Sequence, residues 1–355
     1  MAYTTIDDGS VYFQTKLYTG NETDDTALTN TENSDLQPDW IWIKSRGSTQ
    51  DHQIIDTSRG LTEAFSSNRN DTNTFSDGVK SIQSDGFTLG VNTRYNQNST
   101  NFVAWQWKAN GGTTTSNGAS GDIKASVTQR EDTAKFSICT YTGTGINAGQ
   151  SHRVNHGLGT TPHVMIFKSR GASGDWVVYH HKNTASPETD YLVLNSSAAT
   201  VDSANKFNDT APNTSYATIG GDDNISSGTM LLYSFAEVQG YSKFGIYTGN
   251  GNTDGTFVYT GFRVAWVLLK RTDSGNNWHL HDAKRSNQGG GNPADDILYP
   301  NLENAEADED VDLLSNGFKL RVTGGGHNAS GGSYIYMAFA EHPFVSSEGT
   351  PVTAR

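Results

Sequence analysis

Two histidines in the sequence WHLHD, His279 and His281, are spaced so that they could bind a metal ion. In a β-strand, side chains two residues apart point to the same face, so the pair could offer two imidazoles to one ion. An internal repeat argues against this chemistry, because it aligns His279 with Val177 and Gln53, which are not usual zinc ligands. The sequence also has no cysteine–histidine pattern with zinc spacing. We therefore expect structural histidines, no metal site and no cofactor.

Two further stretches carry oxygen atoms that a hard cation could use. The sequence GNGNTDG at 249–255 begins like a calcium-binding loop, but Gly261 occupies the twelfth position, where a glutamate is required. The acidic run at 308–312 could collect a cation, yet a run of like charges is more often a solvated segment. We expect a hairpin turn at the first stretch and a solvated segment at the second.

Charged pairs occur three residues apart, Asp56 with Arg59 and Asp282 with Arg285. We expect each pair to clamp a turn after a strand; the alternative is a polar binding rim beside a tryptophan. The sequence has no G-x-S-x-G nucleophile elbow, no G-x-x-x-x-G-K-[ST] phosphate loop and no dinucleotide-binding glycine pattern after a strand. We predict that the protein is not an enzyme and has no catalytic residues.

Internal repetition is the strongest signal in the sequence. The tripeptide Tyr-Thr-Gly occurs at 18–20, 141–143 and 247–249. Each tripeptide is followed by an apolar run that ends in a lysine, and these lysines are Lys44, Lys168 and Lys270. Each copy then closes with an aromatic-rich run, at 101–107, 229–238 and 333–341. These landmarks predict three copies of one structural unit.

The repeat and the composition divide the chain into three domains. We expect β-sandwich repeats at 1–109, 127–240 and 241–355, the last with a C-terminal tail. Residues 110–126 are rich in Gly, Ser and Thr, as expected for a flexible linker. Copies two and three are joined only by about six residues, so we expect them to pack against each other.

Composition and local patterns predict an all-β fold. Charged residues make up 18% of the chain and the AVILMFWYC set 34%, so much of the polarity comes from Gly, Ser, Thr and Asn. Such a composition favours strands joined by turns. Short apolar runs such as VMIF at 164–167 resemble buried strands, and the only helix expected lies at 302–314, with a solvated loop as the alternative. We predict tandem β-sandwich domains of a jelly-roll-like type.

The charge and the cysteine content exclude several classes of protein. The formal net charge of −13 would repel a phosphate backbone and an anionic membrane surface, so we expect neither a nucleic-acid partner nor a membrane partner. The single cysteine, Cys139, cannot close an intramolecular disulfide, which excludes a disulfide-stapled small domain.

Four side chains are candidates for ligand binding, namely Trp176, Tyr179, Trp278 and His281. Trp176 and Trp278 follow polar residues at the start of predicted strands, where a ring can stay partly exposed. Such rings could stack on sugars or pack on a neighbouring subunit; the alternative is that they cover the end of their own sandwich. Trp40 and Trp266 lie inside apolar runs and are expected in the core.

Longer segments carry a resemblance to a known family. They are DGSVYFQTKLYTGNE at 8–22, FSICTYTGTG at 136–145, HGLGTTPHVMIFKSR at 156–170, YSKFGIYTGNGNTDGTFVYTGF at 241–262, LLSNGFKLR at 313–321 and YIYMAFAEHPF at 334–344. Together they resemble virion proteins of marine and cyanobacterial tailed phages, whose members are labelled tail fibre or structural proteins. The resemblance covers nearly the whole chain and brings no catalytic motif with it.

The resemblance implies a location in the virion and a non-enzymatic structural role. We expect a tail fibre or tail appendage subunit that contacts the host surface, with other virion proteins and a host surface glycan as partners. We also expect a homo-oligomer, with a trimer favoured. The first alternative is a capsid or head decoration or head-fibre protein without a receptor role. The second is a glycan depolymerase, which would need two carboxylates converging in a groove.

Overall fold

The computed structural model describes residues 2–72, 76–120, 123–143, 145, 149–221, 228–286 and 292–351. It is 44% strand and 3% helix, so the prediction of an all-β fold built from several sandwiches is confirmed. The helices in the described part of the chain are short, and they are η1 (Gly9–Val11), α1 (Thr93–Asn96) and α2 (Ala204–Phe207).

The three copies of the repeat form three units with the same inner sheet. In the first unit the strand order is β1-β7-β3-β4, in the second β11-β18-β13-β14 and in the third β19-β26-β21-β22. The bounds are β1 Phe13–Thr19, β3 Trp40–Ser45, β4 Gln53–Asp56 and β7 Asn101–Trp107; β11 Phe136–Thr142, β13 Val164–Ser169, β14 Val177–His180 and β18 Thr229–Phe235; and β19 Ser242–Thr248, β21 Phe262–Arg271, β22 Trp278–Asp282 and β26 Ser333–Pro343. All of these neighbours are antiparallel.

The inner sheet of the second unit is longer than the other two. It continues on one side into β10 (Ser126–Glu131) and β8 (Thr115–Asn117), and on the other into β15 (Asp190–Val193) and β16 (Val201–Asp202). The segment expected to be a linker therefore supplies an edge strand, β8. Within the same segment, the backbone amides of Gly111 and Gly112 donate to the Asp39 carboxylate at 3.0 and 2.9 Å. Residues 121 and 122 lie outside the described residues, and the domain boundaries stay a prediction.

A second, outer sheet covers the inner sheet of each unit. The outer sheets are β2-β6-β5 (Thr26–Leu28, Gly86–Leu89, Val79–Gln83), β17-β12-β9 (Tyr216–Gly220, Ser151–Asn155, Ile123–Lys124) and β20-β25-β24-β23 (Phe257–Tyr259, Gly317–Leu320, Ala307–Leu314, Ala294–Ile297). The helix expected at 302–314 was wrong, because β24 occupies most of that range. In β24 Val311 and Leu313 are buried while their neighbours are more exposed, which is the period of a strand.

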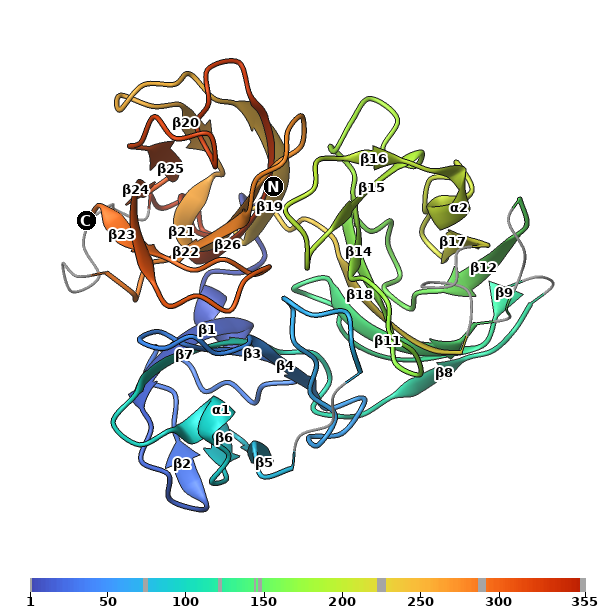
Figure 1. The fold of residues 1–355 in the computed structure, drawn as a ribbon, viewed down its shortest axis with the longest axis horizontal. Helices are drawn as coiled ribbons and strands as arrows, with labels where there is room; N and C mark the ends of the chain where they lie inside the picture. The colour runs from blue at the N-terminus through green and yellow to red at the C-terminus, as the bar shows by residue number, and fades with distance from the viewer. Residues whose placement is uncertain are drawn as a thin grey trace.

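The three units stand around a common centre, with their inner sheets turned toward it (Figure 1). One aromatic core fills this centre and includes residues of all three units. Phe235 of the second unit contacts Trp40 of the first at 5.7 Å and Phe339 of the third at 6.1 Å between ring centroids. Phe339 in turn lies 5.6 Å from Trp107 of the first unit. The units are therefore fused through one shared core, and Trp40 is in the core as predicted.

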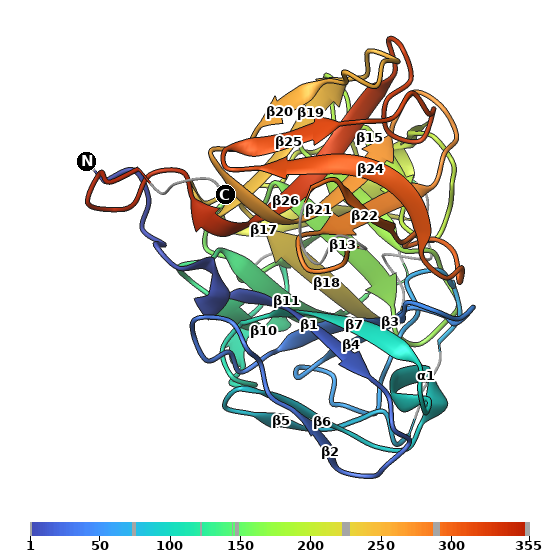
Figure 2. The ribbon, with the colours of Figure 1, turned by 90° about the vertical axis from the view of Figure 1, so that its left-hand side faces the viewer.

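The N-terminal segment of the first unit reaches across to the third. The Tyr3 hydroxyl donates to the carbonyl of Gly261 at 2.8 Å, and the side chain of Asp7 accepts from the backbone amide of Ser347 at 2.6 Å. As a result the two ends of the described chain run side by side (Figure 2). These hydrogen bonds between side chains of the N-terminal segment and the backbone of the third unit add to the junction of the two units.

Candidate functional site

All four predicted binding residues are buried. Trp176 and His281 are 0% exposed, Trp278 is 3% exposed and Tyr179 is 4% exposed. Tyr179 belongs to the core between the two sheets of the second unit. The structure therefore does not present these rings to solvent, and it places the two tryptophans in contacts between units.

The tryptophans and an aligned histidine make equivalent bonds at the three junctions. The Trp176 indole donates to the carbonyl of Ser66 in the first unit, and the Trp278 indole donates to the carbonyl of Val193 in the second, both at 2.9 Å. His52 occupies the aligned position in the first unit. Because the Trp42 indole donates to Nδ1 of His52, the ring proton of His52 lies on Nε2, which donates to the carbonyl of Tyr299 in the third unit at 3.1 Å. Each unit thus bonds to its neighbour, and the third junction closes the circle.

A second set of aligned residues, Asp56, His180 and Asp282, makes equivalent contacts in the opposite direction. Tyr233 of the second unit donates to Asp56 at 2.6 Å, His180 bonds to the carbonyl of Tyr336 in the third unit at 3.1 Å, and Trp105 of the first unit donates to Asp282 at 2.9 Å. Head-to-tail contacts of this kind form a ring when the rotation closes, and here three units of one chain close it.

The predicted arginine clamps lie inside these junctions. Arg59 pairs with Asp56 at 2.5 Å and Arg285 with Asp282 at 2.6 Å, and all four side chains are fully buried. The prediction of a local clamp is confirmed. The alternative of an exposed polar rim does not fit, because none of these four side chains reaches the surface.

The three repeat lysines are also buried, each 0% exposed. Lys168 donates to the carbonyl of Asn70 in the first unit at 3.0 Å, and Lys270 donates to that of Ser197 in the second unit at 3.2 Å. Burial lowers the pKa of Lys44, Lys168 and Lys270 to about 8. Lys168 and Lys270 therefore help to hold neighbouring units together, whereas Lys44 donates to the carbonyls of Ser45 and Ser48 in its own unit.

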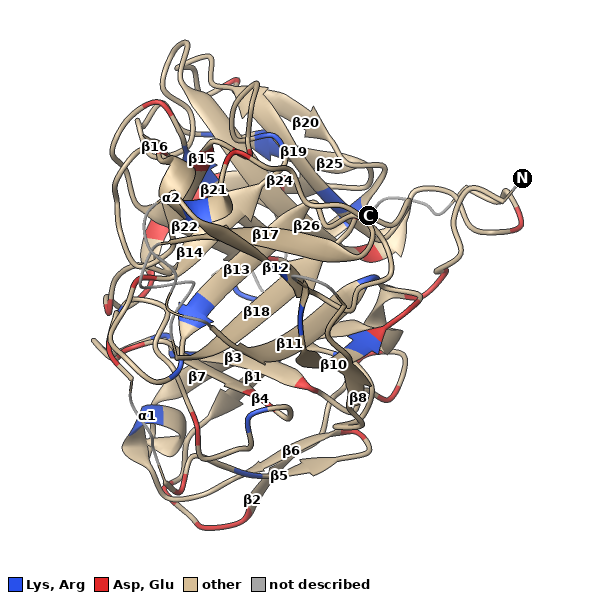
Figure 3. Ribbon diagram, turned by 90° about the vertical axis from the view of Figure 1, so that its right-hand side faces the viewer, with Lys and Arg blue, Asp and Glu red and all other residues tan. Residues whose placement is uncertain are grey.

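In the ribbon of Figure 3, acidic residues lie mostly in loops and at strand ends. Among the described residues, no helix has the length and apolar character needed to span a bilayer.

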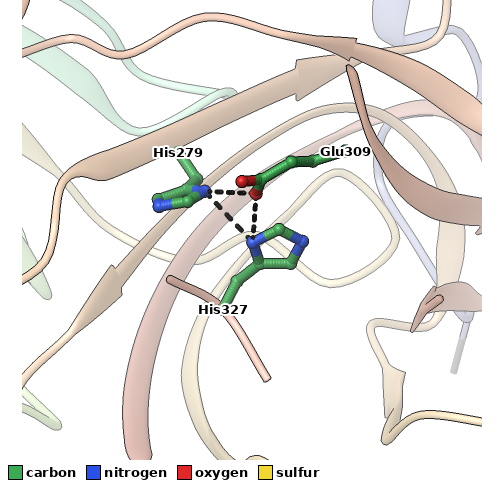
Figure 4. Close-up of side chains that lie close together, drawn as sticks. All are labelled: His279, Glu309 and His327. Carbon is green, nitrogen blue, oxygen red and sulfur yellow. Dashed lines mark hydrogen bonds and ion pairs between the residues drawn. The ribbon is translucent and has the colours of Figure 1, made fainter. Parts of the chain in front are cut away.

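One cluster of side chains in the third unit does not serve a junction between units. It consists of His279 on β22, Glu309 on β24 and His327 in the loop between β25 and β26, and the three point toward one another (Figure 4). The Glu309 Oε2 atom lies 3.1 Å from Nδ1 of His279 and 3.0 Å from Nδ1 of His327. The two Nδ1 atoms are 3.1 Å apart. Three ligand-type atoms therefore form a nearly equilateral triangle.

Burial and charge set the protonation of this cluster. Burial lowers the pKa of His279 to about 4, against the opposing effect of Glu309. Burial alone would raise the pKa of Glu309, but the hydrogen bonds and charges of His279 and His327 outweigh it and hold that pKa far below its usual range. At neutral pH the carboxylate is ionised and His279 is neutral, which are the states that a metal ion needs in its ligands.

The glycine-rich loop GGGHNASGG brings His327 to this place. A Cβ atom at Gly326 would overlap the ring of His279, so only glycine lets the loop pass so close. The side-chain amide of Asn328, which is fully buried, donates to two backbone carbonyls of neighbouring turns. The Tyr247 hydroxyl donates to the carbonyl of His327 at 2.8 Å. The loop is thus held in position by hydrogen bonds to β19 and to neighbouring segments of the third unit.

The same corner of the other units holds different groups. In the first unit Gln53 replaces His279, and Tyr95 takes the place of His327, directly before the asparagine that pins its loop. The Tyr95 hydroxyl donates to Gln53 at 3.2 Å. In the second unit Val177 stands at the position of His279 within an apolar core. The histidine–glutamate cluster is therefore a property of the third unit.

His281 lies next to the cluster and is unusual in its own right. Neither of its ring nitrogens has a hydrogen-bond partner, although the ring is completely buried. The ring centroid is 5.6 Å from that of His327, whose Nε2 atom is also buried without a partner. Buried polar atoms without partners are rare and call for a specific explanation.

Sequence reasoning considered His279 and the acidic run that contains Glu309 but set both aside, and it missed His327. A signal for Glu309 was present, because in a strand it shares a face with the apolar residues Val311 and Leu313. Interpreting the segment as helix or solvated loop concealed that pattern. No spacing rule links His327 to the other two, since the fold alone brings its loop to β22.

Comparison with known families gives one match. Residues 8–343 match the model of a family described as a domain of unknown function, DUF7483. The chain belongs to this family. The match spans all three units, so the family's domain comprises the complete ring. No curated protein and no solved structure matches the chain.

Proposed function

We propose that this member of the DUF7483 family is a non-enzymatic structural subunit of a phage virion, and that it forms part of a tail fibre or tail appendage contacting the host surface. The observation that carries the proposal is the closed ring of three units around one aromatic core. The clamp pairs, Lys168 and Lys270, which could do chemistry in a cleft, are buried at the junctions and bond neighbouring units together. A ring with a continuous core of this kind suits a rigid structural subunit.

The resemblance of the long sequence segments to tailed-phage virion proteins supports the location. Those segments form strands of the inner sheets and, in the third unit, strands of the outer sheet as well, so the resemblance extends to the framework of the ring. Other virion proteins are the partners that such a location implies. A homotrimer remains a prediction, and light scattering on the purified chain would test it.

Two strands of the third unit carry exposed apolar side chains that suit contacts with other subunits. Ile246 on β19 and Phe257 and Tyr259 on β20 are 58%, 45% and 54% exposed. Both strands lie at the edges of their sheets. Exposed apolar side chains on edge strands favour packing against another protein.

A second surface feature suits a host glycan. A hollow of about 240 Å³ lies beside β8 and β10, and it is lined by Asn110, Thr115, Asn117, Thr128, Arg130 and Asp132. Amide, hydroxyl and charged groups of this kind can hydrogen-bond the hydroxyls of a sugar. The proposal places host contact here rather than at the buried tryptophans.

Adsorption tests the receptor role. Purified wild-type protein should compete with phage for host cells, and Arg130→Ala should lose this competition while its melting temperature stays within a few degrees. Asp202→Asn, at an exposed residue of β16, is the matched control and should compete normally.

Three results would overturn parts of the proposal. Absence of the chain from purified virions by mass spectrometry would remove the virion location. Localisation on the head by electron microscopy, with no competition for host cells, would favour a decoration protein. Release of reducing ends from host polysaccharide would establish a depolymerase and refute the non-enzymatic role.

A further inference from the structure

We propose that His279, Glu309 and His327 form a binding site for one divalent transition-metal ion, and that Zn²⁺ is the ion that fits it best. The site would bridge the two sheets of the third unit, because β22 belongs to the inner sheet and β24 to the outer sheet. The proposal rests on the arrangement of the three ligand atoms, and it stands independently of any role in a virion.

Proton counting favours an ion over a hydrogen-bonded cluster. Three atoms separated by 3.0 to 3.1 Å make three short contacts, namely carboxylate to each imidazole and imidazole to imidazole. Two ring protons can satisfy at most two of these contacts, and two Nδ1–H groups that both point at Oε2 leave the nitrogens in unfavourable contact with each other. A cation attracts all three lone pairs at once, so it accounts for the whole triangle.

The size of the triangle fits a bound ion. Zinc lies about 2.0–2.2 Å from imidazole nitrogen and carboxylate oxygen. A point at about that distance from all three atoms exists about 1 Å off their plane, with ligand–metal–ligand angles of roughly 95°. Opening the triangle by a few tenths of an ångström, roughly 0.3 Å, brings these angles to the tetrahedral value. The ligand set therefore needs little adjustment to accept an ion.

The chemistry of the ligands selects the class of ion. Two imidazoles and one carboxylate suit zinc and other first-row transition metals, whereas calcium and magnesium prefer sites made entirely of oxygen. The side chain of Glu309 is 32% exposed, so water can reach the fourth coordination position. The side of the ion that faces His279 and His327 is shielded from solvent, because both imidazoles are buried.

His281 acts in the second shell of the site. When Nδ1 of His327 binds an ion, the ring proton lies on Nε2, and metal-bound histidines usually donate this proton to a neighbouring group. Nε2 of His327 has no partner, and the adjacent ring of His281 has two nitrogens without partners. With ring centroids 5.6 Å apart, His281 is the neighbouring side chain whose free nitrogens would accept this hydrogen bond in the metal-bound state.

The ion would also stiffen the junction between the third and first units. The ring of His279 packs edge-on against Tyr299 at 5.3 Å, and the carbonyl of Tyr299 accepts from His52 of the first unit. An ion that holds His279 in place would therefore also hold Tyr299, whose carbonyl accepts the hydrogen bond that closes the ring. The first unit fills the equivalent corner with the neutral bond between Tyr95 and Gln53 and so provides an internal example without an ion.

Titration of the untagged, metal-stripped chain with Zn²⁺ tests the proposal, since a polyhistidine tag would bind zinc itself. Calorimetry should show one ion per chain, and the melting temperature should rise with zinc because the ion binds only the folded state. Glu309→Gln should weaken binding at least about 100-fold. Asp308→Asn, the same change of charge at the next residue of β24, should bind zinc like the wild type.

Two results of the zinc titration would overturn the proposal. One is a wild-type protein that does not bind one zinc ion per chain. The other is Glu309→Gln protein that remains folded by circular dichroism and binds zinc as tightly as the wild type. Cobalt gives a second readout that does not depend on the stability of a variant. Co²⁺ bound in the wild-type site should absorb visible light strongly, as expected for an ion with few ligands. The weak visible absorption of hexa-aqua cobalt would refute the site.

Discussion

Replacing Trp107 tests whether the three units share one core. This side chain ends β7, lies at the centre of the molecule, and is 1% exposed. It contacts Trp40 of its own unit at 4.4 Å and Trp266 of the third unit at 5.5 Å between ring centroids. Removing a large buried aromatic ring costs about 3–5 kcal/mol. The Trp107 indole N–H is buried without a partner, so its loss returns part of that cost, and we expect Trp107→Ala to lower the free energy of unfolding by about 2–4 kcal/mol.

The distribution of the effect is the decisive measurement. If the core is shared, hydrogen exchange should accelerate in β11, β18 and β26 as well as in β1 and β3, by about 100-fold for a loss of about 3 kcal/mol. Calorimetry should show a single transition moved to lower temperature. Trp107→Phe is the matched control, because it removes the unpartnered N–H and keeps an aromatic ring, and it should cost less than about 2 kcal/mol. Faster exchange confined to the first unit would refute the reasoning.

Three further predictions concern pH and the connecting segment. Below about pH 6.5 the free energy of unfolding should fall. Burial lowers the pKa of His180 to about 3 and that of His279 to about 4, so the unfolded chain binds protons that the folded chain does not. Denaturant melts at about pH 7 and about pH 5 measure this loss, and equal stabilities at the two pH values would contradict it. Between about pH 8 and about pH 10 the free energy of unfolding should rise, because lysines of the unfolded chain have a pKa of 10.5 and the buried repeat lysines a pKa of about 8. A Lys168→Met variant should show a smaller rise. The same dependence of stability on pH in this variant would refute the proposed cause. A protease cut within the exposed residues at 113–120 should leave both fragments together in size-exclusion chromatography, whereas separate elution would show independent domains.

The strands and the repeat could be predicted from the sequence because both signals are local. The runs at 164–167 and 40–43 became strands β13 and β3, and the three lysines occupy the same strand of each inner sheet. The expected helix at 302–314 failed because its acidic residues concealed an alternating pattern that only pairing with β25 makes clear. Local composition cannot show which strand will lie alongside another.

The roles of the candidate residues depend on contacts between distant parts of the chain. Trp176 and Trp278 have polar neighbours in the sequence, which indicates an exposed ring, yet the partners that bury them come from the preceding unit. The same holds for the metal-site proposal, whose ligands lie on two sheets and a loop. Alignment of the repeats compared each unit with the others and treated a non-recurring histidine as evidence against a site, although only the third unit has the glycine-rich loop GGGHNASGG.

Closure of the ring within one chain makes its integrity independent of protein concentration. An assembly of three separate subunits dissociates on dilution, because each contact must be regained by collision. Here the contacts between units are intramolecular, and the chain that joins the units keeps each one at a high effective concentration next to its neighbours. The protein would therefore keep its three-unit ring even at very low concentration. Every molecule would have the same number of units, because one chain contains all three.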